Sequence, residues 1–143
     1  MKTHLVVALA VAVVAVMACT GDALGPGITA NPVEEAGTYT LVTVNDGPLP
    51  AVVLQLETLK GEIVSDVVVV GADSTFTETR QSRITSNGEV SNTQGTTSGT
   101  WSVSAGVATF TVPGASPPTF TGSFSATGLT ATVQGNVLKY TQG

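Results

Sequence analysis

Few residues of this chain can act as nucleophiles, acid–base groups or metal ligands, and the first of them is Cys19. It is the only cysteine among 143 residues, so it has no partner for a disulfide within the chain. An unpaired thiol in an exported protein needs its own explanation. Cys19 closes the sequence Val16-Met17-Ala18-Cys19, which ends an uncharged apolar stretch that begins at Leu5.

The segment before this cysteine has the features of an export signal. One positive charge, on Lys2, precedes the apolar stretch 5–18, which is shorter than the about 20 residues that a transmembrane helix needs. A charged start, an apolar middle and small residues before a cleavage point are typical of a secretory signal peptide. An ordinary signal peptide followed by an incidental cysteine is the simpler alternative.

Val16-Met17-Ala18-Cys19 resembles the lipobox of bacterial lipoproteins, although Met17 is a less typical occupant of its position. The resemblance implies that Cys19 receives a diacylglycerol on its sulfur, that residues 1–18 are removed and that the new amino terminus is acylated. Two or three acyl chains anchor a protein well, whereas one holds it only marginally. Thr20, where Asp would favour retention at the inner membrane, implies the outer membrane of the bacterial envelope, on its periplasmic or surface face.

The rest of the chain offers little for catalysis. His4 is the only histidine and leaves with the signal, so no imidazole remains as a general base or metal ligand. Asp66 could pair with Glu62 or Glu78 as an acid–base dyad, but nothing in the sequence brings these carboxylates together. We therefore predict a protein that is not an enzyme and that uses no metal and no cofactor.

Glu78 and Arg80 alternate with Thr79 on one face of a predicted strand that also carries Phe76. If this face points inward, Arg80 can clamp the carboxylate of an apolar ligand through its bidentate fork, with Glu78 tuning it. The alternative is an exposed pair on an overhanging strand, because burying unpaired charges costs several kcal/mol each.

The charge balance excludes one class of partner. All ten acidic residues follow the cleavage point, and only four basic residues remain beside them, Lys60, Arg80, Arg83 and Lys139. Nucleic-acid binding requires a basic surface that neutralises phosphates. We expect no nucleic-acid partner.

Composition predicts one all-β domain after a linker. Residues 19–36 contain Gly25-Pro26-Gly27 and Asn31-Pro32 and are typical of a flexible tether. Residues 37–143 are rich in Thr, Ser, Val and Gly and show period-two alternation. They predict eight or nine consecutive strands joined by tight turns, the early ones at 38–44, 51–57, 62–70 and 75–84. Asn87-Gly88 predicts a hairpin turn, and Phe120, Gly122 and Phe124 predict one face of a later strand. We expect a mobile loop over much of 89–98.

A meander of this length hides its edges best by closing into an up-and-down barrel, and a two-sheet sandwich is the alternative. Gly37-Thr38-Tyr39 and Gly99-Thr100-Trp101 open the two halves alike, and Val44-Asn45-Asp46-Gly47 is followed by Leu49-Pro50. This pattern resembles that of lipocalin-like barrels of bacterial lipoproteins, with Tyr39 where true lipocalins carry Trp. The resemblance implies a lipocalin-like barrel over 37–143 and leaves its ligand open.

The barrel suggests two functions. Small inward residues such as Gly99, Ala108, Gly122 and Ala131 favour a residual cavity, although eight strands enclose little more than their own side chains. The first hypothesis is an anchored barrel that binds a small apolar ligand. The second is a structural or interaction module with a filled barrel, which contacts an envelope protein through its Thr/Ser faces or the segment 89–98. The residues predicted to line a ligand cavity are Tyr39, Phe76, Arg80, Trp101, Phe110, Phe120, Phe124 and Tyr140.

Overall fold

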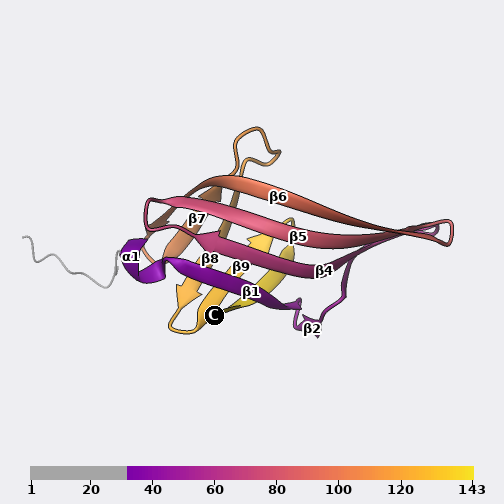
Figure 1. The fold of residues 1–143 in the computed structure, drawn as a ribbon, viewed down its shortest axis with the longest axis horizontal. Helices are drawn as coiled ribbons and strands as arrows, with labels where there is room; N and C mark the ends of the chain where they lie inside the picture. Colours follow the sequence, from indigo (N-terminus) through magenta and orange to yellow (C-terminus); the bar gives the residue numbers. More distant parts are fainter. Residues whose placement is uncertain (1–31) are drawn as a thin grey trace, which may run out of the picture.

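The structure is a computed structural model that describes residues 32–143. The predicted signal peptide, Cys19 and most of the predicted tether lie outside the described residues. One helical turn precedes ten strands (Figure 1). Their bounds are α1 Pro32–Glu35, β1 Gly37–Val44, β2 Gly47–Pro48, β3 Ala51–Gln55, β4 Leu59–Val70, β5 Thr75–Ser86, β6 Glu89–Ser104, β7 Val107–Thr111, β8 Thr119–Ser125, β9 Gly128–Val133 and β10 Asn136–Gln142.

Eight of these strands form a closed antiparallel barrel. From β4 to β10 each strand pairs with the next, β10 pairs with β1, and β1 pairs with β4 to close the ring. The short strands β2 and β3 are additional and pair with β1 and β4. The prediction of an all-β, lipocalin-like up-and-down barrel is therefore confirmed, and the sandwich alternative is wrong.

The barrel wall opens on one side because β4 changes partner along its length. Its last four residues pair with β1, where Thr40 opposite Val67 is the final pair, and its first part pairs with β3. Beyond this point β3, β4 and the β5–β6 hairpin run past the body of the barrel (Figure 1). The molecule therefore has a closed end beside α1 and an open end below an overhanging sheet.

The structure of the β5–β6 hairpin differs from the sequence prediction for residues 89–98. Residues 89–98 are not a loop but the first part of β6, which pairs with β5 along the whole of that strand, from Glu89 opposite Ser86 to Thr100 opposite Thr75. Asn87 and Gly88 make the predicted turn with positive φ angles of 49° and 85°, which suit a two-residue hairpin. The polar composition of the segment reflects exposure of both faces and not a lack of strand structure.

The barrel has one contiguous hydrophobic core drawn from every strand of the ring. Alternate residues point inward, as the period of two in a strand requires, and α1 covers the closed end, where the Tyr39 hydroxyl donates to the backbone oxygen of Glu35 at 2.8 Å. The end of the predicted tether thus contacts the barrel. A closed ring with its own core has what an independent folding unit requires.

Candidate functional site

Six of the eight residues predicted to line a ligand cavity lie together at the closed end and pack against one another. The Phe110 and Phe120 rings stack with centroids 4.8 Å apart, and Phe76 meets Phe110 edge-on at 5.2 Å. Such pairs stabilise a core beyond the area they bury. The other three residues are Tyr39, Trp101 and Phe124, and the Phe124 ring contacts both the Tyr39 ring and the Trp101 ring.

The small residues of this region accommodate the rings. A Cβ atom on Gly99 would lie 2.0 Å from the Thr111 backbone oxygen and 2.8 Å from Cε1 of Phe76. Ala108 and Ala131 are completely or almost completely buried. At Gly122 a Cβ atom would lie 2.5 Å from the Thr130 backbone oxygen. Gly99 and Gly122 therefore allow close packing of the backbone and leave no residual cavity beside them.

The other two predicted residues, Arg80 and Tyr140, meet at Asp66. Arg80 donates from Nε and Nη2 to Asp66 Oδ2, at 3.0 and 2.8 Å, and also from Nη2 to Glu78 Oε1. The Tyr140 hydroxyl donates to the same Asp66 oxygen at 3.0 Å. We call Asp66, Glu78, Arg80 and Tyr140 the charge cluster.

The strand register explains why the charge cluster forms. Asp66 on β4 lies opposite Arg80 on β5, and Val68 lies opposite Glu78, so the Glu78 and Arg80 side chains share the inner face with Asp66. Asp66 is 1% exposed, while the Arg80 and Glu78 side chains are 28% and 14% exposed. The alternative of a solvent-exposed Glu78–Arg80 pair is therefore wrong, and the fold does bring Asp66 and Glu78 together.

Burial dominates the electrostatics of the cluster. It raises the pKa of Glu78 to about 7, since the effect of Arg80, which lowers this pKa, is smaller and the Asp66 charge adds to the rise. Burial would lower the pKa of Arg80, but the carboxylates of Glu78 and Asp66 outweigh it and raise that pKa. The pKa of Tyr140 is raised, first by burial and then by the Asp66 charge. Arg80 thus stays charged, and Glu78 can exchange a proton near neutral pH.

Two hollows adjoin Arg80 at the open end. One, of about 250 Å³, has a wall that is mainly apolar. The other, of about 300 Å³, lies on the inner face of the β5–β6 hairpin and is polar, with Glu78, Ser82, Thr93 and Thr97 in its wall. None of the six packed aromatic residues lines either hollow. The apolar side chains of the first hollow are Val53, Leu54, Ile63, Val133 and Leu138.

Sequence reasoning considered Asp66 only as half of an acid–base dyad with Glu62 or Glu78, and it did not name these apolar residues as part of a site. Asp66 interrupts a Val-rich strand, and a carboxylate within such a run signals a buried partner. The apolar residues gave no such signal, because they come from four separate strands, β3, β4, β9 and β10, which only the tertiary structure brings together.

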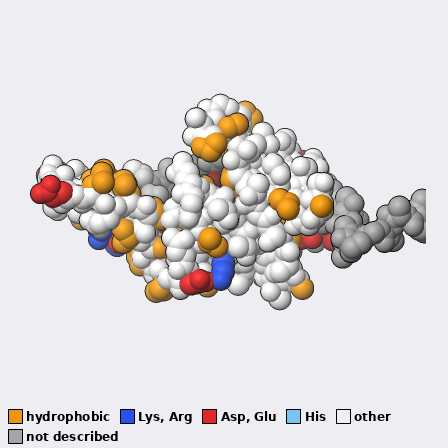
Figure 2. All heavy atoms as spheres, turned by 180° about the vertical axis from the view of Figure 1, so that it is seen from behind, with side chains coloured by type: hydrophobic (Ala, Val, Ile, Leu, Met, Phe, Trp, Pro, Cys, Tyr) orange, Lys and Arg blue, Asp and Glu red, His pale blue; other side chains and the backbone are white. Residues whose placement is uncertain are grey.

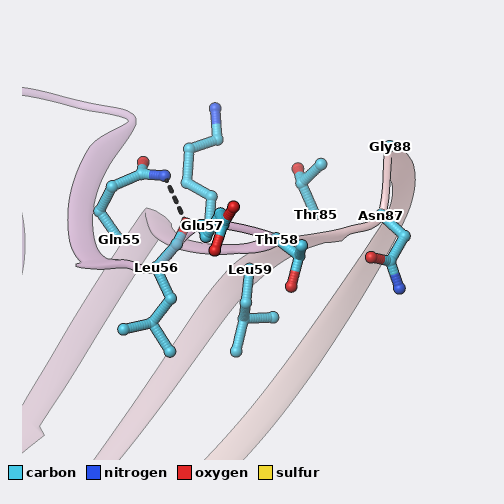
Figure 3. Close-up of a pocket in the computed structure, with 9 residues that line it drawn as sticks. Gln55, Leu56, Glu57, Thr58, Leu59, Thr85, Asn87 and Gly88 are labelled. Carbon is cyan, nitrogen blue, oxygen red and sulfur yellow. Dashed lines mark hydrogen bonds between the residues drawn. The ribbon is translucent and has the colours of Figure 1, made fainter.

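A third and larger hollow, of about 420 Å³, lies at the far tip of the overhang. Figure 3 shows Leu56 and Leu59 projecting to one side of the ribbon, and Gln55 and Thr85 to the other. Gln55 Nε2 donates to the neighbouring Leu56 backbone oxygen at 3.1 Å. The polar groups do not converge on a common point, which a specific ligand site requires, so this hollow is the weaker candidate.

Among residues 32–143, no three His, Cys, Asp or Glu side chains are grouped so that they could hold a metal ion. No helix of the described chain has the length and apolar character to cross a bilayer.

No protein-family model matches the chain, and neither curated proteins nor solved structures show significant similarity to it.

Proposed function

We propose that this protein is a lipid-anchored lipoprotein of the bacterial envelope whose barrel binds a small, largely apolar ligand at its open end. One observation carries the proposal: an apolar hollow of about 250 Å³ adjoins Arg80, a charged side chain held in place by Asp66. Sites for small molecules are mostly apolar with a few fixed polar groups. The ligand lies at this open end and not among the aromatic rings, which already contact one another.

The anchoring part of the proposal rests on Val16-Met17-Ala18-Cys19 and on the absence of a second cysteine in the sequence. Metabolic labelling of cells with radioactive palmitate tests it. We expect label on the wild-type chain and none on the Cys19→Ala variant. An unlabelled wild-type chain would contradict the proposed lipidation and the membrane location that depends on it. It would not bear on ligand binding.

Native mass spectrometry tests the ligand. Residues 20–143 contain every described element, and a cooperative unfolding transition would first verify that they fold. Purified under mild conditions from the natural host, this form is expected to carry a bound molecule of low mass. The variant Leu138→Arg should lose the adduct, because it places a charge in the apolar wall, whereas Val107→Arg, on an exposed position of β7, should retain it. A wild-type domain that is always empty would contradict the proposal.

The second candidate is an interaction module of the envelope. Exposed hydrophobic side chains gather toward the hairpin end of the molecule (Figure 2), and Val90 on β6 and Leu56 after β3 are 60% and 56% exposed. Exposed apolar patches often mark contact surfaces. A photo-cross-linker at position 90 in intact cells should then capture one reproducible protein, whereas a cross-linker at the exposed Val107 should not.

A further inference from the structure

The two hollows at the open end differ in polarity and share Arg80. The 250 Å³ hollow is lined mainly by apolar side chains, among them Leu54, Ile63 and Leu138, with Gln134 and Asn136 beside them. The 300 Å³ hollow is lined by polar residues, among them Glu78, Ser82, Thr93 and Thr97, which share the face of the hairpin that carries Arg80. A molecule that spans both must therefore be amphiphilic, with its tail in the first hollow and its polar head in the second.

Arg80 is the only basic residue of these walls, but its charge is already compensated. Its Nε and Nη2 atoms donate to Asp66, and Nη2 also contacts Glu78. With both carboxylates ionised, the cluster carries one net negative charge. A ligand carboxylate placed beside Arg80 would also meet Glu78 at close range, where like charges repel. The charge cluster thus disfavours an anionic head even though an arginine lines the site.

The polar hollow offers hydrogen-bond acceptors to a ligand. Its lining residues on the face shared with Arg80 include three that have hydroxyl groups, Ser82, Thr93 and Thr97, and one that has a carboxyl group, Glu78. An alkylammonium group has three N–H donors and no acceptor, and hydrogen bonds between charged donors and carboxylates are the strong ones. Space for such a head exists because Gly95, opposite Arg80, carries no side chain, and a Cβ atom there would meet nothing within 4 Å.

We infer that the open end of the barrel takes an amphiphile with a short apolar tail and a protonated amine head, which the Glu78 carboxylate and the neighbouring hydroxyl groups receive. This inference rests on the proposed ligand-binding function and specifies the chemical class of its ligand. The tail lies along the apolar wall formed by β3, β4 and β10, and Asp66 acts as a positioning residue that fixes Arg80 by accepting hydrogen bonds from its Nε and Nη2 atoms.

Isothermal titration calorimetry with three probes of equal tail length tests the inference. The probes are octylamine, octanol and octanoate, titrated at pH 8 into residues 20–143. We expect octylamine to bind at least ten-fold more tightly than octanoate, with octanol between them. Octanoate binding as tightly as octylamine, or more tightly, would overturn the inference and leave the proposed apolar site standing. No binding of any probe would overturn both.

Three variants test separately how the charge of Glu78 and the space beside Gly95 affect probe binding. Glu78→Gln keeps the size of the side chain and should weaken octylamine binding about ten-fold while strengthening octanoate binding. Glu89→Gln is the matched control, because it makes the same change in net charge on the hairpin at its tip, and should change neither. Gly95→Val should weaken all three probes by filling the space beside Arg80. If Glu78→Gln and Glu89→Gln had equal effects on octylamine, general charge attraction would account for the binding and the assigned head-group site would be wrong.

Discussion

At the closed end of the barrel, Tyr39, Phe76, Trp101, Phe110, Phe120 and Phe124 fill the interior with ring-to-ring contacts. At the open end, four titratable side chains form the charge cluster, and two hollows adjoin it. Both regions belong to one ring of strands, so the difference comes from side chains and from where β4 changes partner. Apolar packing closes one end, and buried ions with adjoining space occupy the other.

The closed and the open end differ in what they contribute to the stability of the fold. Burial of large apolar side chains is favourable in itself, whereas buried ion pairs recover their desolvation cost only in part. Asp66 Oδ1 is buried without a hydrogen-bond partner among the described residues, which adds to that cost. We therefore expect the closed end to stabilise the fold more than the open end, which holds the groups on which the proposed ligand binding depends.

Truncation at the closed end should have the largest effect. Phe110→Ala removes a completely buried ring that contacts three other phenylalanines, and such changes cost about 3–5 kcal/mol. Urea denaturation measures the free energy of unfolding. Val107→Ala on the same strand, at a position 49% exposed, should cost less than about 1 kcal/mol. Equal losses for the two variants would mean that the aromatic cluster is not the stabilising core.

The free energy of unfolding should depend on pH through Glu78, which lies at the open end. The pKa of Glu78 is raised from an ordinary value of 4.5 to about 7 by burial and by Asp66, against the opposing charge of Arg80. Between these values the unfolded state loses its proton first, so the free energy of unfolding falls as pH rises, by up to about 3 kcal/mol, and is level above pH 7.

Glu78→Gln should abolish this fall, because the amide does not titrate. Other groups that face Glu78 keep their charge state over the same range, since the pKa values of Arg80 and Tyr140 are both raised. Urea denaturation at pH 5, 6, 7 and 8 for both proteins isolates the difference. Parallel pH profiles for the wild type and the variant would refute the assignment of Glu78 as the group that titrates.

A smaller loss is expected for Asp66→Asn, which keeps the shape of the side chain but removes the charge that faces Arg80. Hydrogen bonds to charged groups contribute about 1.5–3 kcal/mol, and Glu78 still compensates Arg80, so we expect a loss of about 2 kcal/mol. Asp46→Asn removes a carboxylate paired with Lys139 on the surface and should change stability by less than about 0.5 kcal/mol. Thermal and urea unfolding of both variants measure the two losses of stability and show whether the loss for Asp66→Asn is the larger.

The two buried tyrosines allow the finest comparison. Tyr39→Phe at the closed end removes a donor to the neutral backbone oxygen of Glu35, which costs about 1 kcal/mol. Tyr140→Phe removes a donor to the Asp66 carboxylate and should cost more, about 2 kcal/mol. If Tyr39→Phe were the more damaging change, the Tyr140–Asp66 bond would not be a significant part of the charge cluster.

Much of the fold follows from local patterns. Alternation at Phe120, Gly122 and Phe124 predicted β8, and Asn87-Gly88 predicted the hairpin turn. The prediction of a mobile loop over much of 89–98 was wrong, because Thr, Ser and Asn residues are typical of loops as well as of strands exposed on both faces. Pairing with β5 decides between these structures, and pairing does not show in the composition of a single segment.

The candidate site was predictable only in part. Arg80 and Tyr140 were named from their residue types and positions on strands, whereas Asp66 was considered only as half of an acid–base dyad with Glu62 or Glu78, which nothing in the sequence brings together. Its contact with Tyr140 joins residues 74 positions apart. Their separation in the sequence contains no information on their separation in space, which follows from the closure of the ring.

The sequence alone determined most of the strands outside 89–98 and the residues that share each face, because side chains alternate along a strand with a fixed period of two. The proposal of export and lipidation likewise rests on a local motif, Val16-Met17-Ala18-Cys19, whose prediction needs no folded structure. Only the tertiary structure decided that the aromatic rings fill one end and that Asp66, Glu78, Arg80 and Tyr140 meet near the other. The physical reason is that register and ring closure are long-range pairings, and these set which inward side chains become neighbours.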